Sequence, residues 1–85
     1  MKIIFSNSFE KDYKKLPAKI QKLLDEQLIM LLENSKYPSL RVKKMQGHIN
    51  IWEGRITQNY RFTFEKNNDT CTIRRAGTHP ILNNP

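Results

Sequence analysis

Hydrophobic residues in the first 34 positions recur at the spacing of an α-helix. Three of them stand at i, i+4 and i+7: Phe9, Tyr13 and Leu16. Asn7 with Glu10 three residues later matches a capping box, which would begin this helix. Pro17 disfavours the helical conformation for the residue before it and suits the first position of a helix, so it separates a second helix from the first. The second helix has a broad apolar face and should end near residues 34–35; that face comprises Ile20, Leu23, Leu24, Leu28, Leu31 and Leu32.

From residue 40 onward apolar and polar positions alternate, which is typical of strands with one buried face. The pattern predicts four strands joined by short polar turns, at residues 40–45, 49–56, 60–65 and 70–76. Together with a short apolar strand at residues 2–5, the element order is βααββββ. We therefore predict one α+β domain over residues 1–85, with the helix hairpin packed on an antiparallel meander sheet whose other face stays free.

The turn lengths fix which side chains share a face of the sheet. A three-residue turn at 57–59 places Ile56 opposite Tyr60 and Arg55 opposite Arg61, whereas a two-residue turn would mix apolar and charged side chains. The three-residue turn collects the apolar side chains on a core face: Trp52, Ile56, Tyr60, Phe62 and Phe64. The other face carries Glu53, Arg55, Arg61 and Thr63.

The next turn extends this face to the last strand. A four-residue turn at 66–69 would place Arg74 opposite Arg61, so that Arg55, Arg61 and Arg74 form a row across three strands. Like charges directly opposite one another are destabilising. Two explanations stay open: Glu53 could neutralise the row in a surface ion network, or the row could bind phosphate, whose oxygens match paired guanidinium groups.

The charge of the chain is uneven. The net charge is +7, yet residues 1–34 carry six Lys and five Asp or Glu, whereas residues 35–85 carry nine Lys or Arg and three Asp or Glu. The second half therefore attracts a polyanion, and we predict RNA contacts for Lys43, Lys44, Arg74 and Arg75. Arg41, on the same predicted strand as the two lysines, could extend this positive field. Because no apolar run approaches the ~20 residues of a membrane span, and the single cysteine, Cys71, can form no internal disulfide, we expect a cytoplasmic protein without a membrane partner.

His79 is the candidate for proton transfer. It stands at the end of the last predicted strand, near Arg74 and Arg75. A histidine beside a turn is more often structural, but beside a phosphate site it could exchange a proton near neutral pH. The sequence contains no metal-ligand cluster and no Gly-rich phosphate loop, so neither a metal nor a cofactor is expected.

Residues 51–64 (IWEGRITQNYRFTF), followed by residues 69–79, resemble the RelE/ParE superfamily of bacterial toxin–antitoxin toxins and are closest in motif to YoeB-type ribosome-dependent endoribonucleases. The residues that match occur at the spacing of the family, with no gap in the alignment: Trp52, Arg55-Ile56-Thr57, Tyr60-Arg61 and His79. The element order resembles that family along essentially the whole chain, although the first 40 residues match in pattern only.

The resemblance implies a type II toxin that blocks translation by cleaving mRNA through metal-independent attack of the RNA 2′-hydroxyl. It implies that Arg55 and Arg61 contact the mRNA backbone, Arg61 at the scissile phosphate, and that His79 is the general acid. The chain departs from YoeB at 77–80, where Gly-Thr-His-Pro stands in place of Arg-Tyr-His-Tyr. Lysines occupy the strand that holds the YoeB glutamate, so the general base is unassigned. Lysine or arginine serves such a role in RelE-like members, and Glu53 is a weak substitute on the same face as Arg55 and Arg61.

The expected partners are a cognate antitoxin, the ribosome and mRNA, in a homodimer or a toxin–antitoxin hetero-oligomer. A ParE-type toxin that poisons DNA gyrase is one alternative, and it would need neither His79 nor the arginine row. A non-catalytic basic module that binds RNA or an acidic protein is another. A single-strand binder would stack bases on aromatic side chains of its basic face, whereas the aromatic residues here are assigned to the core.

Overall fold

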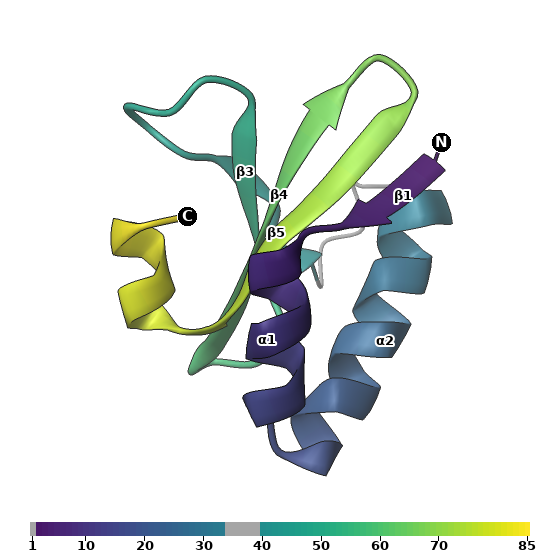
Figure 1. Ribbon diagram of the computed structural model, residues 1–85, viewed down its shortest axis with the longest axis vertical. Helices are drawn as coiled ribbons and strands as arrows, with labels where there is room; N and C mark the ends of the chain where they lie inside the picture. The colour runs from purple at the N-terminus through teal and green to yellow at the C-terminus, as the bar shows by residue number, and fades with distance from the viewer. Residues whose placement is uncertain (1, 34–39) are drawn as a thin grey trace.

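The computed structural model describes residues 2–33 and 40–85. Its elements are β1 (Lys2–Phe5), α1 (Asn7–Lys15), α2 (Ala18–Glu33), β2 (Lys43–Lys44), β3 (Ile51–Arg55), β4 (Tyr60–Asn67), β5 (Thr70–Thr78) and the 3₁₀ helix η2 (His79–Asn83). The two helices lie beside a five-stranded sheet of order β1-β5-β4-β3-β2 (Figure 1). The α+β fold and the element order are as predicted, and the predicted end of the second helix lies outside the described residues.

The cap of the first helix lies one residue earlier than predicted. The Ser6 hydroxyl, rather than the Asn7 side chain, accepts a hydrogen bond from Phe9 N at 3.0 Å. The same hydroxyl donates to the Arg74 carbonyl oxygen at 2.8 Å, so one side chain caps α1 and ties it to β5. At the other end Leu16 is extended, with φ −73° and ψ 142°, as expected for the residue before Pro17.

The core lies between the helices and one face of the sheet. Helix α2 buries four aliphatic side chains at three- and four-residue spacing: Ile20, Leu24, Leu28 and Leu31. They belong to the same buried cluster as Phe62 and Phe64, which are stacked at 5.8 Å between ring centroids. A Cβ at Gly54 would overlap the Phe62 ring, so the strand pairing Gly54↔Phe62 requires glycine there.

The registers of the sheet confirm one predicted turn and correct the other. Strands β3 and β4 pair Trp52↔Phe64 and Arg55↔Arg61, as predicted. Strands β4 and β5 are joined by two residues instead of four, because Asn67 pairs with Thr70. Asn68 adopts φ +50°, a conformation that asparagine tolerates better than most residues and that permits the tighter turn.

The strands of the middle region are shorter than predicted. Strand β2 comprises only two residues, and β3 begins at Ile51 instead of residue 49. Ile49 is 86% exposed, so its apolar side chain marks no strand. Asn50 has φ +61°, which interrupts an extended backbone just before β3.

The sheet is mixed, and its second face is partly covered. Strand β1 pairs in parallel with β5 at Lys2↔Thr70 through Phe5↔Ile73, so the sheet is not the purely antiparallel meander that was predicted. Helix η2 contacts β4 and β5 on the side away from α1 and α2 (Figure 1). Ile81 is buried there, and Thr63 in β4 is fully buried. The prediction of a wholly free face was therefore wrong, because the end of the chain folds back over part of it.

No helix in residues 2–33 and 40–85 combines the length and the apolar character needed to cross a membrane.

Candidate active site

Two arginines face each other across the β3–β4 hairpin. Arg55, the last residue of β3, pairs directly with Arg61, the second residue of β4. Partial burial lowers the pKa of the Arg55 guanidinium, and the positive charges of Arg61 and Arg41 lower it further, whereas Glu53 acts in the opposite direction. A guanidinium remains charged despite such a shift. The pair is therefore a concentrated positive charge that an anion would stabilise.

The turn of the hairpin fixes the position of Arg61. Its Nη1 donates hydrogen bonds to the carbonyl oxygens of Thr57 at 2.9 Å and Gln58 at 2.8 Å. The Thr57 hydroxyl in turn accepts from the backbone N–H groups of Asn59 and Tyr60, each at 3.3 Å. A guanidinium has five N–H donors, so Arg61 keeps donors for a ligand while the turn holds it in place.

Arg61 lies between two surface hollows. The first, of about 320 Å³, is lined by Arg41, Val42, Lys43, Glu53, Arg55 and Arg61. The second, of about 470 Å³, is lined by Gln58, Asn59, Tyr60, Arg61, Thr78, His79 and Pro80. His79 is exposed and begins η2, directly after β5. The structure therefore places two of the predicted catalytic residues, Arg55 and His79, around the third, Arg61.

Arg41, predicted only to extend the positive field of the neighbouring lysines, lies beside the arginine pair. It lines the first hollow and lowers the pKa of Arg55, and its backbone has φ +47°, which is uncommon for a bulky side chain. Its position two residues before Lys43 is consistent with that prediction, because alternate residues of an extended segment share a face. Lys43 lines the same hollow, whereas Lys44 pairs with Trp52 and therefore belongs to the opposite face.

The chain has a relative that settles its family. It is 36% identical over 79 residues to Toxin RelE3 of Methanocaldococcus jannaschii, and the match covers 89% of this chain and 88% of that protein. The chain belongs to the RelE family of toxins. No family model matches the sequence.

Solved structures agree with this RelE-family assignment. The RelB–RelE antitoxin–toxin complex from Methanococcus jannaschii matches with a TM-score of 0.75 and 26% identity over 95% of both chains. YafQ from E. coli matches with a TM-score of 0.80 over 94% of both chains, and the YoeB/ParE toxin from Agrobacterium tumefaciens with 0.78 over 93% of this chain and 99% of that one. Both are 16% identical and share the fold.

The predicted row of three arginines is not present in this RelE-family chain. Arg61 lies opposite Gly77, and a β-bulge at Thr63/Phe64 makes Arg74 an extra residue in β5. The four-residue turn assumed from the sequence shifted the register, and the bulge has no sequence signature in this strand. A row of two arginines remains, with Arg41 at one end and His79 beyond Gly77 at the other.

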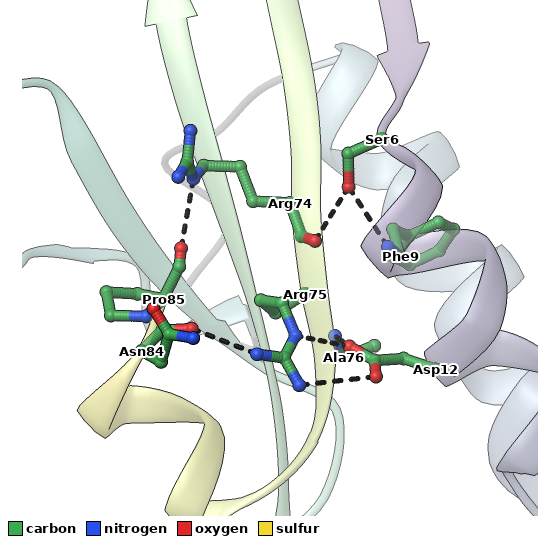
Figure 2. Close-up of polar contacts among 8 residues, drawn as sticks. All are labelled: Ser6, Phe9, Asp12, Arg74, Arg75, Ala76, Asn84 and Pro85. Atoms are coloured by element: carbon green, nitrogen blue, oxygen red, sulfur yellow. Dashed lines mark hydrogen bonds and ion pairs between the residues drawn. The ribbon is translucent and has the colours of Figure 1, made fainter.

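Arg74 and Arg75 are held by partners of their own (Figure 2). Arg74 forms an ion pair with Glu65 at 3.0 Å, and its Nε donates to the Pro85 carbonyl oxygen. Arg75 Nε lies 2.7 Å from Asp12 Oδ2, and its Nη1 donates to the Asn84 carbonyl oxygen. The hydrogen bond to Asp12 raises the pKa of Arg75. These contacts fasten α1 and the C-terminal residues to the bulge, and they lie apart from the two hollows.

Among residues 2–33 and 40–85, no three or more His, Cys, Asp and Glu side chains are grouped so that they could hold a metal ion.

Proposed function

We propose that this chain is the toxin of a type II toxin–antitoxin system, an endoribonuclease that cleaves mRNA on the ribosome in the cytoplasm and so blocks translation. The observation that carries the proposal is the position of Arg61, which lines one hollow with Arg55 and another with His79. Membership of the RelE family supports the same activity.

The site suits cleavage by the RNA itself. Arg55 and Arg61 would bind the non-bridging oxygens of the scissile phosphate and stabilise the charge of the pentacovalent species. The 2′-oxygen would form a bond to phosphorus while the bond to the 5′-oxygen breaks. His79 would donate a proton to that leaving oxygen, which gives a 2′,3′-cyclic phosphate and a free 5′-hydroxyl. No step in this scheme uses a metal or a protein nucleophile.

The sparse site explains why a ribosome would be needed. Attack requires the 2′-oxygen, phosphorus and 5′-oxygen in line, and such orientation supplies a large part of a catalysed rate. Two arginines and one exposed histidine hold a phosphate but do not fix the sugar. The ribosome would supply that geometry by holding the message in an extended conformation.

The proposed protein partner is an antitoxin. The related M. jannaschii structure is a RelB–RelE antitoxin–toxin complex. Neutralisation would require the antitoxin to cover the hollows or to prevent entry into the ribosome. Whether the assembly is a simple heterodimer or a larger hetero-oligomer is decided by the mass of the purified complex.

Expression of the chain alone tests the proposal. Growth should stop with translation blocked and with messages cut, and co-expression of the cognate antitoxin should restore growth. The purified protein should cut ribosome-bound mRNA but leave a message with a 2′-deoxy residue at the cut site intact. Growth arrest with intact messages and broken chromosomes would contradict the proposal and indicate a gyrase poison, and absence of any arrest would indicate a non-catalytic binding module.

A further inference from the structure

Glu53 is a carboxylate in the middle of the cationic face. It lies in β3, paired with Lys43 on one side and with Thr63 on the other. Its side chain is 10% exposed, and the acidic group would be costly to bury without a positive partner. Lys43 Nζ stands 3.6 Å from Glu53 Oε1, and the lysine side chain is 72% exposed. Strand pairing thus places Glu53 where the positive charge of an exposed lysine offsets its negative charge.

The carboxylate faces the same hollow as the phosphate-binding arginines. The charged side chains that line this hollow come from three segments: Arg41 and Lys43, Glu53 and Arg55, and Arg61. At 3.6 Å the lysine contact is an ion pair longer than a hydrogen bond. An ionised carboxylate has about four lone-pair positions. Glu53 therefore keeps the capacity to accept a hydrogen bond from a hydroxyl group that enters the hollow.

A buried hydroxyl marks the same place. Thr63 lies directly opposite Glu53 in the strand pair and is fully buried. Its Oγ1 forms no hydrogen bond among the described residues. Leaving such a group unpaired in the interior lowers the stability of the folded state. Unpaired buried polar groups are rare in folded proteins and are often connected with function.

Glu53 and His79 lie on different sides of Arg61. The hollow of Glu53 and the hollow of His79 share Arg61 and no other lining residue. A phosphate bound at Arg61 would thus have a carboxylate on one side and an imidazole on the other. In-line displacement needs this arrangement, because the entering and leaving oxygens stand on opposite sides of phosphorus.

We propose that Glu53 is the general base of the cleavage reaction, and this rests on the proposed endoribonuclease function. The Glu53 carboxylate accepts the proton of the 2′-hydroxyl as the 2′-oxygen bonds to phosphorus, and the protonated His79 gives its proton to the departing 5′-oxygen. One proton is gained at Glu53 and one is lost at His79, so exchange with water restores both. Before RNA binds, the positive charge of Lys43 offsets the negative charge of Glu53.

Single-turnover cleavage of ribosome-bound mRNA by Glu53→Gln tests this inference. The variant keeps the shape of the side chain but cannot accept the proton, so its rate should fall by about 10²–10⁴-fold with mRNA affinity kept. The acidic limb of the wild-type pH–rate profile, where the base becomes protonated, should disappear. Glu65→Gln is the matched control, because Glu65 lies outside both hollows in an ion pair with Arg74; its rate should match wild type.

A substrate with sulfur in place of the 5′-oxygen separates base from acid. A thiolate leaves without protonation, so this substrate should restore cleavage by His79→Gln and should not restore cleavage by Glu53→Gln. Glu53→Ala with added formate gives a second measurement, in which the small carboxylate should recover part of the lost rate. Glu53→Gln and Glu53→Ala should each have a urea unfolding midpoint near that of wild type.

The outcomes separate the two proposals. If wild type leaves ribosome-bound mRNA intact, the proposed function fails and the role of Glu53 fails with it. If wild type cuts and Glu53→Gln cuts within a few-fold of it, the function stands and Glu53 is not the base. A slow Glu53→Gln variant that retains the acidic limb, and that formate does not rescue, would show that Glu53 only positions the arginines.

Discussion

At the scale of single residues, the proposed chemistry depends on how Arg61 is held. Two carbonyl oxygens of the hairpin turn accept hydrogen bonds from Arg61, whereas Arg55 opposes it without any attraction between the two. The pair therefore combines a fixed cation with a neighbour whose pKa is lowered by burial and like charge. Such repulsion strengthens phosphate binding, because the negative charge of the ligand offsets the repulsion between the two guanidinium groups.

Alanine at Arg55 and at Arg61 should give equal losses of activity but opposite changes of stability. Each should slow cleavage by about 10²–10³-fold, the effect of removing one donor that stabilises transition-state charge. Arg55→Ala should raise the melting temperature because it removes a like charge. Arg61→Ala should lower the free energy of unfolding by about 1 kcal/mol because the turn loses its hydrogen bonds. Kinetics and thermal melts check both, and a fully unfolded Arg61→Ala would contradict a primarily functional role.

His79→Gln should slow single-turnover cleavage by about 10²–10⁴-fold without weakening binding to the ribosome or the antitoxin. Glutamine keeps a polar side chain in the hollow but cannot donate a proton as imidazolium does. Cleavage of ribosome-bound mRNA is measured across pH for wild type and variant. A variant that cuts within a few-fold of wild type, with an unchanged pH profile, would transfer proton donation to another group.

At the scale of elements, the bulge in β5 decides what its arginines do. The extra residue turns Arg74 and Arg75 toward the C-terminal carbonyl groups and toward α1 (Figure 2). Asp12 also accepts a hydrogen bond from Ala76 N at 3.1 Å, so one carboxylate holds both the Arg75 side chain and the backbone next to it. Their predicted contact with RNA remains a prediction, and mutation separates it from a structural role.

Arg75→Ala should destabilise the protein by about 1–3 kcal/mol, because the half-buried Asp12 carboxylate loses its charged partner. Arg74→Ala is the control: the Arg74 side chain is 40% exposed, so its ion pair with Glu65 should contribute under about 1 kcal/mol. Urea unfolding measures both values. If Arg75 serves RNA instead, its variant would unfold like wild type and bind the message more weakly.

The sequence predicted the β3–β4 hairpin but not the β4–β5 hairpin, for a physical reason. Around residues 57–59 each wrong register would bury an arginine, so the apolar pattern specifies one pairing. Residues 65–70 are all polar, so their pattern is compatible with several turns. Arg55, Arg61 and His79 could therefore be brought together from the sequence, whereas the displacement of Arg74 required coordinates. Arg41 was predicted to extend the positive field, but its positive φ has no counterpart in the pattern.

At the scale of the whole molecule, the two faces of the sheet have separate tasks. One face packs on α1 and α2 and holds the buried cluster, and the other carries the hollows and η2. Variants of the hollows should therefore change activity with little effect on the core. The Cys71 thiol lies in the buried cluster, and burial raises its pKa.

Cys71 should react with thiol reagents only when the whole domain unfolds. Burial keeps the thiol protonated and inaccessible in the native state, whereas the unfolded chain forms thiolate near its ordinary pKa of about 8.5. Above that pH the unfolded state should therefore bind fewer protons than the native state, and stability should fall as pH rises. Labelling rates in increasing urea measure the accessibility of the thiol. Urea unfolding at several pH values measures the loss of stability, with Cys71→Ala as the control that shows no such loss. Fast labelling under native conditions would show that β5 opens locally.

The parallel pairing of β1 with β5 also constrains when this protein can become active. Residues 68 positions apart in the chain are hydrogen-bonded at this seam, as Ser6 and Arg74 are. Such high contact order makes folding wait for nearly all of the chain and slows it. A chain that stops before residue 70 therefore lacks β5, Arg75 and His79, and under the proposed function it should not cleave mRNA even if the elements before β5 form.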